Sequence, residues 1–117
     1  MPEMTEKSEP NPERRPAPRR RVLLPGMIVF GNGTFTCDCN FRSLSATGAR
    51  ISVAGQHHFG GRIYLINIRE GLAYDAQVIW SKDADIGLKF NAVIALSTTT
   101  DPGFSRLKKL WLAKRIS

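Results

Sequence analysis

The chain has 117 residues, of which 42% are hydrophobic, and it carries a formal net charge of +7. This length suits one domain with one core, and the basic balance favours anionic partners. No apolar run approaches the ~18 residues that a membrane-spanning helix needs, and residues 1–12 contain no apolar segment typical of a signal peptide. We therefore expect a cytoplasmic protein without membrane insertion.

The first 18 residues are predicted to form a disordered N-terminal arm, because five prolines alternate with charged residues and leave little to bury. The chain turns strongly basic at residues 13–21, Glu-Arg-Arg-Pro-Ala-Pro-Arg-Arg-Arg. Arginine suits bidentate recognition of phosphates because its donors form a planar fork. The segment predicts an anionic, nucleotide-like partner, with a nonspecific polyanion-binding tail as the alternative.

The folded domain is expected to cover residues 19–117 and to consist mainly of strands. Residues 27–30 and 34–41 flank Gly31-Asn32-Gly33, a sequence typical of a hairpin turn. Apolar and polar residues alternate again over 48–53, 62–68, 74–80 and 86–90. Within 74–80 this alternation assigns Trp80 to the buried face as a core anchor. Six short strands predict a small antiparallel barrel or sandwich.

The spacing of apolar residues changes from alternation to helical periodicity near the C-terminus, where an amphipathic helix is predicted at about residues 101–115. Phe104, Leu107 and Trp111 follow helical spacing, and basic residues lie opposite them. Asp101-Pro102 is typical of an N-cap followed by proline in the first turn. The apolar stripe, including Trp111, is expected to pack on an end or side of the barrel.

The residue types that commonly carry catalysis or bind metals do not form a convincing site. Cys37 and Cys39 fall on one face of a strand and are interpreted as small apolar residues. His57 and His58 are interpreted as part of a solvated loop because no further ligand stands near them. The sequence shows no nucleophile with a base, carboxylate pair or Walker-type phosphate loop. We predict neither an enzyme nor a bound cofactor.

Three segments together resemble one family. Arg15-Pro-Ala-Pro-Arg19 precedes the first strand, Ser43-Leu-Ser-Ala-Thr-Gly48 follows the second, and Val78-Ile-Trp80 leads to Ile86-Gly-Leu-Lys-Phe90. The order and spacing resemble PilZ domains, the bacterial receptors for cyclic di-GMP, over about residues 13–112. The short, stand-alone PilZ proteins of alphaproteobacteria are especially similar. The resemblance implies a six-stranded antiparallel β-barrel with a C-terminal helix.

The same resemblance implies the site residues. The paired arginines of the arm would grip the guanine edges and phosphates, neighbouring arginines would add phosphate contacts, and the hydroxyl and glycine positions of the loop would complete a clamp. The residues concerned are Arg14, Arg15, Arg19, Arg20, Ser43, Ser45 and Gly48. The ligand would order the arm, and the changed surface would act on an unidentified protein in motility, adhesion or polysaccharide production.

Ser43 departs from the family pattern, which has Asp or Asn at this position. Replacing a charged acceptor by a hydroxyl costs about 1–3 kcal/mol of binding free energy, or roughly a tenfold to hundredfold loss of affinity. This keeps open a PilZ adaptor that acts by protein contacts without nucleotide. A nonspecific nucleic-acid-binding barrel is the third interpretation, because small barrels bind single strands through basic grooves.

Overall fold

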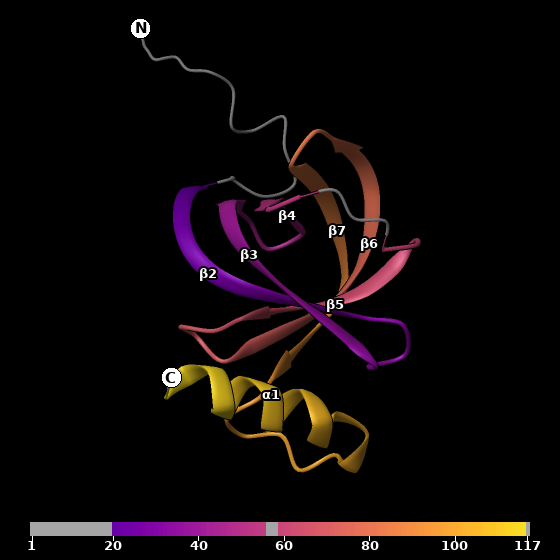
Figure 1. The fold of residues 1–117 in the computed structure, drawn as a ribbon. Coiled ribbons are helices and arrows are strands. Elements are labelled where there is room, and N and C mark those ends of the chain that lie inside the picture. The colour runs from indigo at the N-terminus through magenta and orange to yellow at the C-terminus, as the bar shows by residue number, and fades with distance from the viewer. Residues whose placement is uncertain (1–19, 56–58, 117) are drawn as a thin grey trace, which may run out of the picture.

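The computed structural model describes residues 20–55 and 59–116, and of residues 20–22 it describes the backbone. The proposed arm of residues 1–18 therefore lies outside the described part, as do His57 and His58. Six antiparallel strands form a closed barrel in the order β2-β3-β4-β7-β6-β5 (Figure 1). The strands are β2 (Arg20–Phe30), β3 (Phe35–Leu44), β4 (Gly48–Val53), β5 (Arg62–Asn67), β6 (Leu72–Lys82) and β7 (Asp85–Ala95). The predicted six-stranded barrel is confirmed.

The hairpin between β2 and β3 forms where the glycine-rich sequence predicted it. Gly31, Asn32 and Gly33 have φ values of 61°, 57° and 87°, so the chain passes through three successive left-handed residues. Glycine and asparagine are the residues that adopt this conformation at lowest cost. Phe35 stands 57% exposed just after the turn, because this end of the hairpin projects beyond the buried part of the barrel.

Some strands, such as β2 over Met27–Phe30, are continuously apolar because their two faces pack into two different apolar clusters. Side chains such as Ile28, Phe41 and Leu65 point into the barrel and form its core. Their neighbours on the same strands, among them Val29 and Ile66, point outward into a second cluster beneath the helix. A strand that buries both faces loses the alternation of polar and apolar residues.

The C-terminal segment forms a single 3₁₀ turn, η2 (Pro102–Phe104), followed by the helix α1 (Ser105–Arg115). The Asp101 carboxylate accepts a hydrogen bond from the Gly103 amide at 2.8 Å, so the predicted cap starts the 3₁₀ turn. Leu107 and Trp111 are buried against the barrel, and the Trp111 indole donates to the Ile68 carbonyl at 2.8 Å. Trp111 is therefore the core anchor that the sequence predicted.

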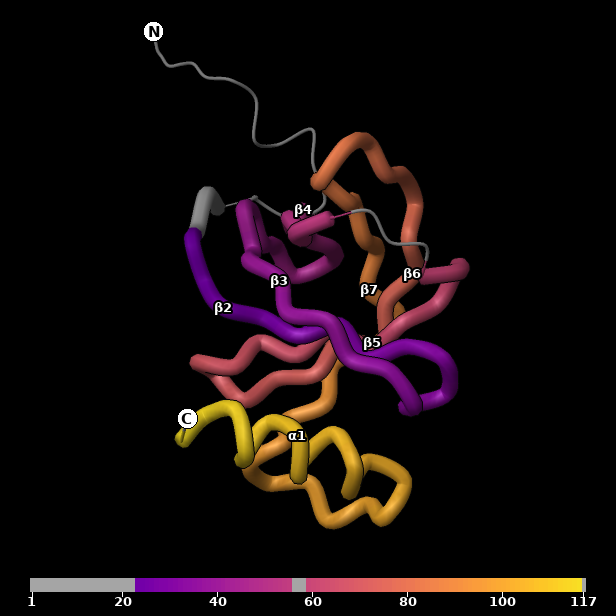
Figure 2. Tube along the Cα trace, in the orientation of Figure 1, coloured from indigo at the N-terminus to yellow at the C-terminus, as the bar shows by residue number. Residues whose placement is uncertain are grey.

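Figures 1 and 2 place α1 as a separate layer at one end of the barrel, opposite the end that holds β4 and the carboxyl end of β3. Among the described residues, no helix has the length and apolar character needed to cross a membrane.

Candidate functional site

The turn between β3 and β4 is organised by the Ser45 side chain. Its hydroxyl accepts hydrogen bonds from the amides of Thr47 and Gly48, both at 3.2 Å. The Ser45 amide also donates to the Gly48 carbonyl at 2.9 Å. A hydroxyl that bonds to nearby backbone in this way stabilises a turn. The geometry therefore gives Ser45 a loop-ordering role.

Gly48 lies in close contact with the backbone of β7. A Cβ at this position would overlap the Leu88 carbonyl oxygen. Gly48 has no left-handed φ, so the requirement for glycine comes from this close approach rather than from the turn. The backbone atom of β7 has little freedom to move away, and a larger residue would separate the two strands.

Ser43 is buried although it faces away from the barrel interior. It is only 5% exposed, and no hydrogen-bond partner of its hydroxyl exists among the described residues. A shift in register between Phe41 and Ser43 leaves Arg42 unpaired as a bulge. A bulge changes which residues point to each face of a strand, so Ser43 stands opposite Arg50 rather than over the core.

Ser43 belongs to a row of paired residues that crosses five strands. Arg21 pairs with Ser43, Ser43 with Arg50, Arg50 with Gly87, and Gly87 with Trp80. We call these five residues the cross-strand row. The row connects the first residues of β2 to the exposed face of β6, and it joins basic, hydroxyl and aromatic groups across one surface of the barrel.

Trp80 is a member of the row that the sequence prediction placed wrongly. A register shift between Val78 and Trp80 leaves Ile79 as an extra residue, so Trp80 points to the outer face and is 43% exposed. It is not a core anchor. Gly87 makes room for the indole, because a Cβ on Gly87 would overlap the ring. A glycine within the strand sequence Ile86–Phe90 was the one feature of the sequence that could have indicated this close packing.

Arg50 also belongs to the cross-strand row, and the sequence prediction did not include it among the site residues. Its guanidinium lies 3.7 Å from the Asp85 carboxylate, and both side chains are partly exposed. An exposed ion pair contributes little to stability. Arg50 can therefore exchange this carboxylate for an anionic ligand at small cost.

Four of the seven predicted site residues lie in the described part of the chain. Arg20 begins β2, and its backbone pairs with Leu44 at the end of β3. Ser43, Ser45 and Gly48 lie at this same end of the barrel. The predicted Ser43–Gly48 loop is shorter than expected, because Ser43 lies within β3 and Gly48 begins β4. The remaining three, Arg14, Arg15 and Arg19, lie outside the described residues.

The two thiols are poorly suited to reactivity or metal binding. Burial raises the pKa of Cys39 to about 12 and also raises the pKa of Cys37, so both stay protonated at neutral pH. The thiolate is the nucleophile and metal ligand. In the part of the chain that the structure covers, no group of three His, Cys, Asp or Glu residues is placed to hold a metal ion.

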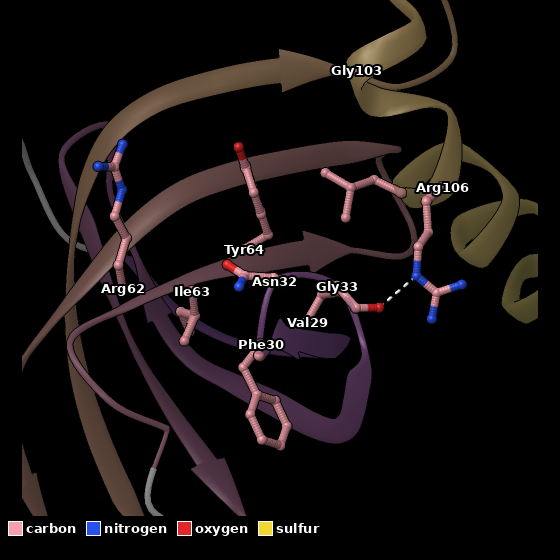
Figure 3. Close-up of a pocket in the computed structure, with 11 residues that line it drawn as sticks. Val29, Phe30, Asn32, Gly33, Arg62, Ile63, Tyr64, Gly103 and Arg106 are labelled. Carbon is pink, nitrogen blue, oxygen red and sulfur yellow. Dashed lines mark hydrogen bonds between the residues drawn. The ribbon is translucent and has the colours of Figure 1, made fainter.

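A cavity of about 350 Å³ lies at the other end of the barrel. The β2–β3 turn, β5 and the start of α1 line it (Figure 3). Arg62 forms two hydrogen bonds with Asp75, at 3.0 and 2.6 Å, and the Arg106 Nε donates to the Gly33 carbonyl. Both arginines are thus engaged by the protein itself, and we assign no ligand to this cavity.

Comparison with known proteins agrees with this architecture. The family described as PilZ domain matches residues 13–98. A solved structure, the PilZ domain of CeSA from a cellulose-synthesizing bacterium, superimposes with a TM-score of 0.54 at 15% identity, covering 82% of this chain and 97% of that one. At this identity the match shows the fold. The search of curated proteins found no match. The chain therefore belongs to the PilZ domain family, whose members are binding and adaptor domains rather than enzymes, as the sequence indicated.

Proposed function

We propose that this protein is a cytoplasmic receptor for cyclic di-GMP. PilZ domains are in general receptors for this dinucleotide. The observation that carries the proposal is the pairing of Arg20 with Leu44 and of Arg21 with Ser43. This pairing brings the carboxyl end of the basic segment directly beside the Ser43–Gly48 loop. The two segments that would form a clamp therefore meet at one end of the barrel.

The roles follow from the chemistry of each group. Arg15 and Arg19 bind guanine edges and phosphates, since a guanidinium fork matches both the O6/N7 edge of guanine and a pair of phosphate oxygens. Arg14 and Arg20 add phosphate contacts. Closure of the arm over the ligand has an entropic cost that the ion pairs must exceed.

On the loop side of the clamp, Ser45 and Gly48 have structural roles and Ser43 is the candidate for ligand contact. Ser45 keeps the turn in shape through its own backbone hydrogen bonds, and Gly48 keeps β4 against β7. Ser43 supplies a buried hydroxyl that has no hydrogen-bond partner within residues 20–55 and 59–116. Such a group costs free energy in the unliganded protein. A hydrogen bond to the arm or ligand would remove that cost.

The exposed indole of Trp80 extends the proposed surface. It stands three strands from Ser43 along the cross-strand row, which corresponds to about 14 Å at ordinary strand spacing. Base stacking on an exposed aromatic ring is favourable and largely sequence-tolerant. We therefore propose that Trp80 contacts one end of the dinucleotide and reports binding through its fluorescence, with Trp80→Phe as the control for emission from Trp111.

A second candidate is a PilZ adaptor that works without nucleotide. Ser43 favours it, because the loop there lacks the charged or amide acceptor of the family pattern. Titration of wild type and Ser43→Asp with cyclic di-GMP separates the two. Binding by wild type supports the receptor, whereas binding by Ser43→Asp alone supports the adaptor.

Nonspecific nucleic-acid binding is tested in the same assay. A bound single-stranded oligonucleotide that cyclic di-GMP fails to displace, with affinity falling steeply as salt rises, identifies a general polyanion binder. In the receptor, micromolar cyclic di-GMP displaces any oligonucleotide that occupies the clamp. Ligand binding would then shift the population of arm conformations and act on a partner protein in motility, adhesion or polysaccharide production.

A further inference from the structure

The helix α1 is unusually basic for its length. Its eleven residues include five cations and no acid: Arg106, Lys108, Lys109, Lys114 and Arg115. The helix dipole favours cations in the last turn, which accounts for Lys114 and Arg115, but it disfavours cations near the start. Arg106 and Lys109 also repel each other at a spacing of three residues. Helix stability therefore does not explain the charge of the first half of α1.

The face of α1 that points away from the barrel carries an apolar pair. Leu112 is 40% exposed and Ile116, directly after the helix, is 85% exposed. They stand four residues apart and so share one face. The buried Leu107 and Trp111 occupy the face that packs on the barrel. Leu112 and Ile116 thus add nothing to the cluster that attaches the helix to the barrel.

The cations flank this apolar pair, and several are held in place by contacts to the protein. The Arg115 guanidinium lies 5.2 Å from the centre of the Trp111 ring, and Lys108 Nζ donates to the Thr99 carbonyl at 3.3 Å. Lys114 pairs with Asp38 at 2.8 Å. Among the described residues, Asp38 is the only carboxylate paired with a cation of α1, so these residues neutralise one of its five cations.

The position of α1 makes this face accessible. The helix forms the outermost layer at one end of the molecule, and the Ser43–Gly48 loop lies toward the other end (Figures 1 and 2). The cavity beside α1 is lined by Arg106 and Leu107, on the side of the helix that faces the barrel, and not by Leu112 or Ile116. The outward side of the helix lies at the edge of the molecule (Figures 1 and 2), which leaves it open to a broad anionic surface.

We propose that the outward face of α1 docks this protein on an anionic phospholipid surface. Leu112 and Ile116 enter the headgroup layer, and Lys109 and Arg115 pair with lipid phosphates. Exposed apolar residues flanked by cations are the combination that gives peripheral attachment to such surfaces. The inference does not depend on nucleotide binding, because the clamp and α1 lie at different ends of the barrel.

The test is co-sedimentation of the full chain, without nucleotide, with vesicles of phosphatidylcholine alone or with about one third phosphatidylglycerol. We expect partition onto the anionic vesicles to exceed partition onto the neutral ones at least ~tenfold. Leu112→Ser combined with Ile116→Ser should lower it about fivefold or more. This double variant retains every charge, so attraction between the arginine-rich segment and the vesicles is unchanged in it.

Matched controls come from exposed positions elsewhere. Val93→Ser removes a 52% exposed apolar side chain from β7 and should leave partition within about twofold. Lys109→Glu should weaken it more than Lys82→Glu on the β6–β7 hairpin. Equal partition of the double variant and Val93→Ser overturns the proposal. Failure of the wild type to bind anionic vesicles also overturns it and leaves an acidic protein as the partner to seek for this face.

Discussion

The indole ring of Trp80 occupies the space directly above the Cα of Gly87 on the neighbouring strand. A Cβ at position 87 would overlap Nε1, Cε2 and Cδ1 of the ring. The two residues are register partners in the β6–β7 ladder. This contact fixes an exposed aromatic side chain at one end of the cross-strand row, where the proposed ligand surface ends.

Gly87→Ala should therefore displace the Trp80 indole and destabilise the barrel. Overpacking by one methyl group typically costs about 1–3 kcal/mol of unfolding free energy, and urea denaturation measures it. Gly61→Ala is the matched control, since nothing lies within 4 Å of a Cβ there and its φ is not left-handed. Equal midpoints for the two variants would show that the indole moves aside without cost.

Ser43→Ala should leave stability unchanged or raise it by up to about 1 kcal/mol. The Ser43 hydroxyl is buried without a hydrogen-bond partner among the described residues, and removal of such a group relieves a desolvation penalty. Urea denaturation of the nucleotide-free protein gives the result. A loss above about 1 kcal/mol would reveal a partner for the hydroxyl.

The Arg62–Asp75 pair predicts a dependence of stability on acid. The hydrogen bond from Arg62 lowers the pKa of the Asp75 carboxyl below its ordinary value of 3.8. The contribution of this carboxyl is therefore complete above the ordinary pKa and is lost as pH falls through the depressed pKa of the folded state.

Asp75→Asn should accordingly destabilise the protein at about pH 7, and the difference from wild type should shrink near pH 2.5. Urea midpoints at the two pH values measure this. Asp83→Asn, at an exposed turn residue with φ of 56° that asparagine tolerates, is the control. A difference in urea midpoint between wild type and Asp75→Asn that stays constant with pH would contradict a stabilising role for the ionised Asp75 carboxylate.

The buried Cys39 thiol should resist modification in the native protein. Burial raises its pKa to about 12, so almost none is thiolate at about pH 8. A Cys37→Ser variant isolates it for labelling with iodoacetamide, followed by mass spectrometry. Labelling should require denaturant. Fast labelling of the folded variant would mean that β3 opens readily.

Much of the fold could be predicted from the sequence because turns and periodicity are local properties. Gly31-Asn32-Gly33 defined the hairpin, and the spacing of Leu107 and Trp111 defined the buried face of the helix. The bulges at Arg42 and Ile79 could not be predicted, because a one-residue shift in pairing depends on both strands. That shift moved Trp80 from the predicted core to the surface.

The candidate site was predictable only in part for the same reason. Backbone pairing places Ser43 beside Arg21 at the start of β2, and Ser45 and Gly48 follow it in the chain. Arg50 and Trp80 join them only through pairing across several strands, which no short motif encodes. The roles of Arg14, Arg15 and Arg19 stay predictions.

The most direct test of the receptor proposal is calorimetric titration of the full chain with cyclic di-GMP. The wild type should give saturable heat with a dissociation constant of about 1–100 μM. Arg15→Ala with Arg19→Ala should abolish it, whereas Arg69→Ala, at an exposed arginine of the β5–β6 turn, should not. Absence of heat up to about 1 mM ligand, or equal binding by the double variant, would contradict the account.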